Sequence, residues 1–126
     1  MNVTTNSINW FEIPTVDIKR ARAFYEKVFG ISMHETEMMG MKMAFFPYQP
    51  GSGKAAGSLV QGPMHKVHQD GCVIYLNGDP DLSAALEKVE TAGGRIVMPK
   101  TSLGDFGNMA FFIDTEGNKV GLHSQK

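Results

Sequence analysis

Two short segments contain residue types that could do chemistry. His65 and His68 are three residues apart, a spacing that would place two imidazoles beside one metal ion if the segment were helical. Gly62 and Pro63 precede them and no helical pattern surrounds them, so a solvated linker is favoured. The segment 51–54, Gly-Ser-Gly-Lys, lacks the spacing of a phosphate-binding loop, and no helix follows it. Neither segment therefore predicts a metal or phosphate site.

Hydrophobic periodicity predicts two helices and eight strands. One helix is expected from Ile18 to Phe29, capped by Asp17 and stopped by Gly30; the other is opened by residues 79–81 and runs to about Ala92. The expected strands are 8–16, 31–38, 41–48, 55–61, 72–77, 95–98, 109–113 and 119–123, and residues 99–106 are expected to form a loop. The predicted core residues are Phe11, Ile13, Phe24, Tyr25, Val28, Leu82, Leu86 and Val89.

The last two predicted strands form a β-hairpin around the turn Asp-Thr-Glu-Gly-Asn, residues 114–118. The carboxylate of Asp114 can accept a hydrogen bond from the backbone two residues further on. Gly117 can adopt a positive φ without a steric clash of a Cβ atom. The hairpin supplies the seventh and eighth of the expected strands.

An internal repeat divides the chain into two modules. Met-Ala-Phe-Phe occurs at 43–46 and again at 109–112, and an aspartate followed by a helix that ends at glycine occurs in both halves at nearly the same spacing. Two copies do not make a solenoid. We therefore expect an α+β fold of two βαβββ modules, residues 8–61 and 72–123, joined by a linker at 62–71 and curled into one eight-stranded cup.

Length and composition are typical of a small single-domain protein. The chain has 126 residues, 12 basic and 13 acidic, which argues against a nucleic-acid partner because such proteins need a basic face. No apolar run is long enough to span a membrane and no basic and apolar leader is present, so no membrane partner is expected. Cys72 is the only cysteine, which excludes an intrachain disulfide and favours a reducing, cytoplasmic location.

Three segments resemble the vicinal oxygen chelate superfamily, the group of glyoxalases, bleomycin resistance proteins and extradiol dioxygenases. They are residues 13–17 with 23–30, residues 92–94, and the turn 114–118, in which Thr115 stands where the family usually has proline. The resemblance implies the βαβββ fold and, in the members that use a metal, four ligands on the first and last strands of each module. Counting from the helix caps and through the repeat places these positions at or next to Trp10, at Gly57 or Ser58, within 73–75, and at Gly121.

None of these positions carries histidine, glutamate or aspartate, so the resemblance predicts a member without the usual metal ligands. The candidate catalytic residues are Glu12 and His123, each placed beside a ligand position and able to act as a general base. Glycine at both 57 and 121 predicts a roomy cup floor. The aromatic side chains that are available to line this cup suit an organic ligand. The predicted ligand-binding residues are Trp10, Glu12, Tyr48, Ser58, Tyr75, Phe111 and Gly121.

Three functions remain open at this point. The first is a small-molecule binder without metal or other cofactor, the second a metal-dependent lyase, isomerase or dioxygenase of the superfamily, and the third an enzyme that uses Glu12 or His123 without a metal. The resemblance also implies a homodimer, since single-length members commonly pair and often complete their cups across chains.

Overall fold

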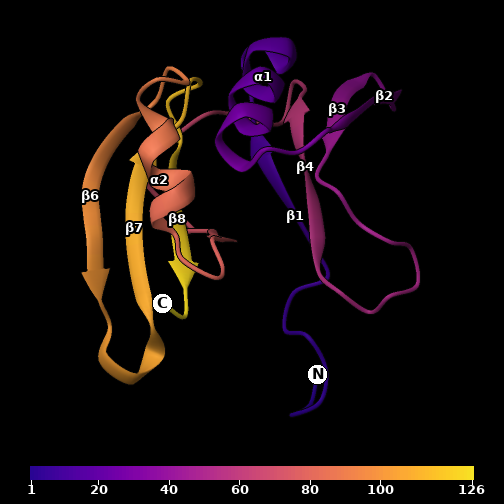
Figure 1. The fold of residues 1–126 in the computed structure, drawn as a ribbon. Helices are drawn as coiled ribbons and strands as arrows, with labels where there is room; N and C mark the ends of the chain where they lie inside the picture. Colours follow the sequence, from indigo (N-terminus) through magenta and orange to yellow (C-terminus); the bar gives the residue numbers. More distant parts are fainter.

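In the computed structural model, which describes residues 1–126, the chain forms two modules with the same order of elements (Figure 1). The first module consists of β1 (Trp10–Pro14), α1 (Ile18–Phe29), β2 (His34–Met38), β3 (Met41–Phe45) and β4 (Ala56–Gln61). The second consists of β5 (Tyr75–Asn77), α2 (Ser83–Val89), β6 (Arg95–Ser102), the short 3-10 helix η1 (Gly104–Phe106), β7 (Asn108–Ile113) and β8 (Lys119–Ser124). The predicted α+β fold of two βαβββ modules is confirmed.

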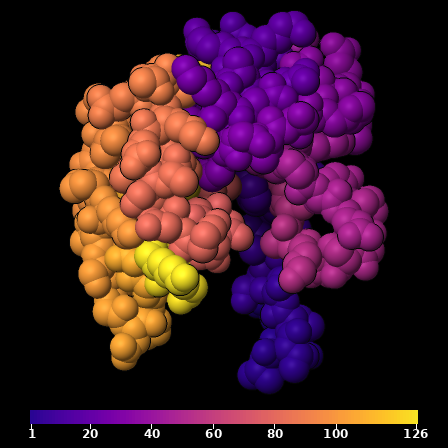
Figure 2. Space-filling view, viewed as in Figure 1, coloured from indigo at the N-terminus to yellow at the C-terminus, as the bar shows by residue number.

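The eight strands are divided between two sheets rather than joined in one. The strand orders are β1-β4-β3-β2 and β5-β8-β7-β6, and no strand pairing connects the sheets. In each module the first strand pairs in parallel with the last, and the remaining pairs are antiparallel. In the space-filling view the two modules meet where α1 lies and separate toward the N-terminal segment (Figure 2). The modules are therefore held together by packing and side-chain contacts.

The core is one cluster that both modules share. It contains 18 buried residues from α1, α2 and the helix-facing sides of both sheets. Seven of the eight predicted core residues are buried, and the eighth, Phe11, is partly buried against the same cluster. Because the helix-facing sides of both sheets contribute to one core, the opposite side of each sheet points away from it.

The predicted local signals at the helix and hairpin ends are confirmed. The Asp17 carboxylate accepts hydrogen bonds from the N–H groups of Lys19 and Arg20, both at 3.1 Å, and caps α1. Gly30 adopts the left-handed conformation after the helix. In the hairpin turn the N–H of Glu116 donates to Asp114 Oδ1 at 2.9 Å, and Gly117 has a φ of 101°.

The expected loop at 99–106 is wrong, because β6 continues to Ser102. Proline cannot donate to a neighbouring strand, so a strand was expected to end before Pro99. The structure tolerates it because β6 is an edge strand and its register with β7 shifts between Met98 and Thr101. Five further elements are markedly shorter than expected: β1 begins at Trp10, β2 at His34 and β5 at Tyr75, β3 ends at Phe45, and α2 spans only 83–89.

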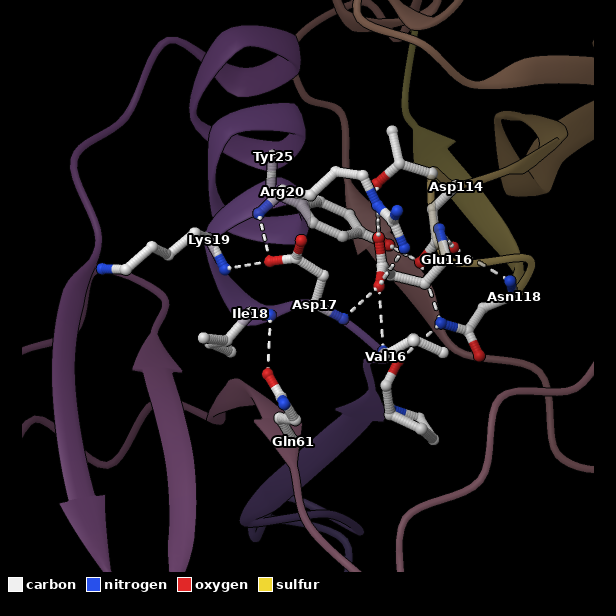
Figure 3. A network of polar contacts seen from close by, with 12 residues as sticks. Val16, Asp17, Ile18, Lys19, Arg20, Tyr25, Gln61, Asp114, Glu116 and Asn118 are labelled. Atoms are coloured by element: carbon white, nitrogen blue, oxygen red, sulfur yellow. Dashed lines mark hydrogen bonds and ion pairs between the residues drawn. The ribbon is translucent and has the colours of Figure 1, made fainter.

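A polar network joins the hairpin turn of the second module to the β1–α1 junction of the first (Figure 3). The buried Glu116 carboxylate accepts from the backbone N–H groups of Val16 and Asp17 at 2.9 and 2.7 Å, and it pairs with Arg20 at 2.7 Å. The Asn118 amide donates to the carbonyl of Pro14 at 2.8 Å. We call this set the inter-module clamp. It fixes the C-terminal end of β1, the strand that carries Trp10 and Glu12, against the second module.

Glu116 makes the clamp sensitive to acid. Burial alone would raise the pKa of Glu116, but the hydrogen bonds from Arg20, Asp17, Thr115 and Val16 outweigh burial and lower this pKa below its ordinary value of 4.5. A carboxylate whose pKa is lower in the folded state stabilises the fold at neutral pH. That contribution is lost as the pH falls from the unfolded value through the folded one.

Glu116→Gln is therefore expected to lower the free energy of unfolding by about 2–3 kcal/mol at pH 7, because two backbone donors lose a charged acceptor. The deficit relative to wild type should begin to shrink as the pH falls below about 4.5, the ordinary pKa of this carboxyl in the unfolded chain, and should be lost below the lowered pKa of the folded state. Denaturant unfolding of both proteins at pH 7 and at pH 3 measures the effect. An equal deficit at both pH values would contradict this account of the clamp.

Candidate functional site

Three aromatic rings form an exposed cluster on the outward side of the first sheet. Trp10 on β1 lies 5.6 Å from Phe45 on β3 and 5.8 Å from Tyr48, and Phe45 lies 6.2 Å from Tyr48, measured between ring centroids. All three pairs are edge-to-face, a favoured geometry for aromatic pairs. Trp10 keeps 38% and Tyr48 keeps 49% of its surface exposed. The module-one aromatic cluster therefore offers ring surface to a ligand.

Glu12 lies on the same side of β1 as Trp10 and makes a hydrogen bond that the sequence did not predict. His65 Nε2 lies 2.8 Å from Glu12 Oε1. Because a carboxylate only accepts, Nε2 is the ring nitrogen that carries the proton. Ser58 is the register partner of Glu12 on β4, is fully buried, and its hydroxyl has no hydrogen-bond partner. Glu12 and Ser58 are thus brought together, and His65 joins them.

The contact between Glu12 and His65 contributes little net stability. A hydrogen bond to a charged group is worth about 1.5–3 kcal/mol. The other ring nitrogen of His65, Nδ1, is buried without a partner, and a Cβ atom on Gly62 would lie 3.5 Å from it. An unsatisfied buried polar atom costs about 1–3 kcal/mol. The cost offsets much of the gain and leaves a net contribution on the order of 1 kcal/mol, so another donor could replace His65 at the Glu12 carboxylate.

The predicted ligand-binding residues of the second module form a separate cluster. Tyr75 on β5 and Phe111 on β7 lie 5.7 Å apart between ring centroids, and Tyr75 is 48% exposed. His123 Nε2 lies 2.6 Å from the carbonyl oxygen of Phe106 and therefore donates to it. No ring pair connects this cluster to the module-one aromatic cluster. The two candidate bases, Glu12 and His123, thus lie on different sheets and are not brought together.

The sequence suggested that Gly57 and Gly121 leave a roomy cup floor, but in the structure they do not. A Cβ atom on Gly121 would lie 2.6 Å from the ring of Tyr75, and one on Gly57 would lie 2.6 Å from the ring of Phe11. Each glycine therefore accommodates a ring that packs directly against the strand. Gly57 also lies beside Phe11, which packs against the core, so it faces the helices rather than the ligand side.

A cavity of about 530 Å³ lies between the modules and includes Glu12 in its wall. Its volume is within the range of small-molecule sites, about 300–1,000 Å³. The wall combines β1, the linker and the start of β8. Its residues are Glu12, Ile13, Pro14, His68, Asp70, Gly71, Cys72, Ile74, Asn118, Lys119 and Val120. Glu12 is therefore reachable from the cavity as well as from the aromatic side of β1.

The residues at the implied metal positions do not fit a metal ion. Trp10, Ser58, Tyr75 and Gly121 supply at most weak oxygen donors, whereas protein-bound zinc needs at least three strong ligands. No group of three or more His, Cys, Asp or Glu side chains is arranged to hold a metal. His65 and His68 do not act together either, because His65 turns to Glu12 while His68 lies in the wall of the inter-module cavity.

His65 is the residue that sequence reasoning missed. A solvated linker was predicted for it, but its side chain is only 18% exposed and is bound to Glu12. The available signal was the Gly62-Pro63 turn directly after β4. Because β4 pairs in parallel with β1, a chain that turns back at the end of β4 returns over β1.

Comparison with known proteins identifies the architecture. Residues 7–122 match the model of the Glyoxalase/Bleomycin resistance protein/Dioxygenase superfamily. The CFP32 proteins of Mycobacterium tuberculosis and Mycobacterium bovis are 30% identical over 118 residues, which is 90% of this chain but 44% of theirs. The chain thus spans less than half the length of these relatives. A glyoxylase-like domain-containing protein of Didymella fabae is 32% identical over 120 residues, 92% of this chain and 91% of that protein.

Solved structures share the fold at lower identity. TnmS3, an antibiotic binding protein from Streptomyces sp. CB03234, superimposes with a TM-score of 0.65 at 21% identity and covers 99% of this chain and 100% of that one. At this identity the likeness concerns the fold alone. Neither α1 nor α2 has both the length and the apolar character that crossing a bilayer requires.

Proposed function

Because the chain belongs to the Glyoxalase/Bleomycin resistance protein/Dioxygenase superfamily, we propose that it binds a small organic molecule without a metal ion. The ligand lies against the module-one aromatic cluster and is anchored by the Glu12 carboxylate. The observation that carries this proposal is the combination of an exposed three-ring cluster with one acidic side chain on the same side of β1.

Aromatic rings and a carboxylate select the chemistry of the ligand. Ring faces attract flat apolar groups and cations, and a partly desolvated carboxylate prefers a cationic or hydroxyl-bearing group. An aromatic molecule with an amine or hydroxyl group satisfies both requirements. The antibiotic-binding function of TnmS3 is consistent with this class of ligand. The single free cysteine, Cys72, supports a reducing cytoplasmic location as part of the proposal.

Mass spectrometry of molecules that copurify with the protein tests the proposed function, together with metal analysis of the same sample. The expected result is an organic compound and no stoichiometric metal. One tightly held metal per chain after dialysis would instead support a metal-dependent lyase, isomerase or dioxygenase. Trp10 is the only tryptophan, so its fluorescence reports directly on binding at the cluster.

The proposed binder is a homodimer. The outward side of each sheet leaves large rings exposed, with Trp10 at 38%, Tyr48 at 49% and Tyr75 at 48%, and neither cluster is covered by the other in one chain. A two-fold axis that places the second-module cluster of one protomer over the first-module cluster of its partner would cover both, and two-fold dimers are the commonest oligomers.

Light scattering is expected to give twice the chain mass of 13.8 kDa. Replacing Tyr75 by serine removes ring surface from the proposed interface and should shift the protein toward monomer at low concentration. Val3→Ser, which alters an exposed apolar residue outside both clusters, is the matched control. A constant mass of 13.8 kDa over a wide concentration range would contradict the dimer.

A further inference from the structure

The linker between the modules is held over β1 by few contacts, and the shortest of them is the one between His65 and Glu12. The other hydrogen bonds of residues 62–71 are longer: the N–H of His65 donates to the carbonyl of Gly62 at 3.2 Å, and the N–H of His68 donates to Asn118 Oδ1 at 3.4 Å. The linker residues His68, Asp70 and Gly71 form one wall of the inter-module cavity. The bond to Glu12 is therefore the shortest hydrogen bond that ties the linker carrying this wall to β1, and the 3.4 Å bond of His68 ties it to the hairpin turn.

From this arrangement we infer that His65 competes with the ligand for the Glu12 carboxylate. The linker 62–71 then acts as a gate that opens access to Glu12 when the ligand displaces His65. An aromatic amine replaces His65 at Glu12, and the linker moves away from β1 when it does. This inference rests on the proposed function and adds to it a residue that competes with the ligand.

The unpartnered Nδ1 of His65 is the observation that makes displacement favourable. While Nε2 donates to Glu12, Nδ1 is packed without a partner in the linker turn beside Gly62. When the ring leaves Glu12, water can hydrogen-bond to both nitrogens. The ligand therefore has to replace a single hydrogen bond whose formation left another polar atom unsatisfied.

The charges around Glu12 favour an ammonium group as the replacing donor. Asp70 lines the same cavity and adds a second negative charge. The basic residue Lys119 also lines the cavity, but its ammonium lies 5.3 Å from the centroid of the Phe111 ring and is directed to the second-module cluster. His68 is exposed and makes no side-chain hydrogen bond. An aryl group on the same molecule can contact the ring of Trp10.

Tyramine, which joins a phenol ring to a primary amine, is the probe for the test, and Trp10 fluorescence is the readout. His65→Ala is expected to bind tyramine about threefold to tenfold more tightly than wild type, because the binding-competent form no longer has to compete with the internal contact. Gln69→Ala, an exposed residue of the same linker that neither contacts Glu12 nor lines the cavity, should bind as wild type does. Equal or weaker binding by His65→Ala would overturn the inference.

Limited trypsin digestion tests the gate without any ligand. Lys66 is exposed and is the only lysine or arginine between residues 62 and 71, so cleavage there yields fragments 1–66 and 67–126. This cleavage should be several-fold faster in His65→Ala than in wild type and Gln69→Ala, and tyramine should accelerate it in wild type.

The two measurements separate failure of the gate from failure of the proposed function. Equal rates of cleavage at Lys66 in His65→Ala and Gln69→Ala would show that the bond to Glu12 does not hold the linker, and would overturn the gate whatever the ligand. Absence of a fluorescence response to tyramine in every variant, with faster cleavage in His65→Ala, would contradict the proposed ligand class. Thermal melts of the variants confirm that each is folded at the assay temperature.

Discussion

Replacement of Asp114 by alanine is expected to lower the free energy of unfolding by about 3–5 kcal/mol, because Asp114 holds the turn that carries both clamp residues of the second module, Glu116 and Asn118. The Asp114 carboxylate accepts four hydrogen bonds. The buried hydroxyl of Tyr25 donates to it at 2.8 Å, and the other donors are the N–H groups of Glu116 and Asn118, each at 2.9 Å, and the Asn118 amide at 3.0 Å. Removing the carboxylate leaves buried donors without an acceptor in the turn that joins the modules.

The carboxyl of Asp114 and the hydroxyl of Tyr25 are both buried, and burial shifts the pKa of each. Burial raises the pKa of Asp114 despite its hydrogen bonds, and burial together with the Asp114 charge raises the pKa of Tyr25. Burying the charged Asp114 carboxylate costs free energy, and the alanine variant no longer carries this cost. The expected loss in the free energy of unfolding is therefore smaller than the summed contributions of the four broken hydrogen bonds.

Calorimetry should show the Asp114→Ala effect as a fall of about 10–20 °C in the midpoint of thermal unfolding, given the usual entropy of unfolding per residue. Asp105→Ala is the matched control, because Asp105 is exposed on η1 and makes no side-chain hydrogen bond in the structure. A fall of less than about 3 °C for Asp114→Ala would mean that the clamp does not hold the modules together.

The fold was predictable because local and long-range signals agreed. Asp17, Gly30 and the turn at 114–118 each have a local cap or turn conformation that depends on few neighbours. The repeat of Met-Ala-Phe-Phe predicted two equivalent strands, and these are β3 and β7. Errors occurred where a neighbour decides the outcome. Pro99 lies within a strand only because β6 is at a sheet edge.

The candidate site was predictable only in part. Alternation along β1 correctly placed Trp10 and Glu12 on one side and Phe11 and Ile13 on the other. Which of the predicted residues share a surface depends on how the two modules pack, and no local pattern contains that information. For the same reason the sequence did not show that His65 reaches Glu12 or that the ring of Tyr75 fills the space at Gly121.

Replacement of Glu12 by glutamine is expected to weaken binding of tyramine by tenfold or more, equivalent to about 1.4 kcal/mol. Glutamine keeps the shape of the side chain and removes the charge that attracts an ammonium group. The midpoint of thermal unfolding should change little, because the contact with His65 is offset by its unpartnered Nδ1. The decisive observation is thus a large effect on affinity without a matching effect on stability.

Titration of Trp10 fluorescence measures this affinity, and Glu37→Gln is the matched control. Glu37 is exposed on β2, and its replacement changes the net charge of the protein by the same amount. If long-range charge alone attracted the ligand, both variants would weaken binding equally; if Glu12 is the anchor, only Glu12→Gln does. Unchanged binding by Glu12→Gln would contradict the proposed site. Uptake of one tight zinc, nickel or iron ion per dialysed chain would contradict the absence of a metal, since one carboxylate and one imidazole cannot supply the three protein ligands that such a site requires.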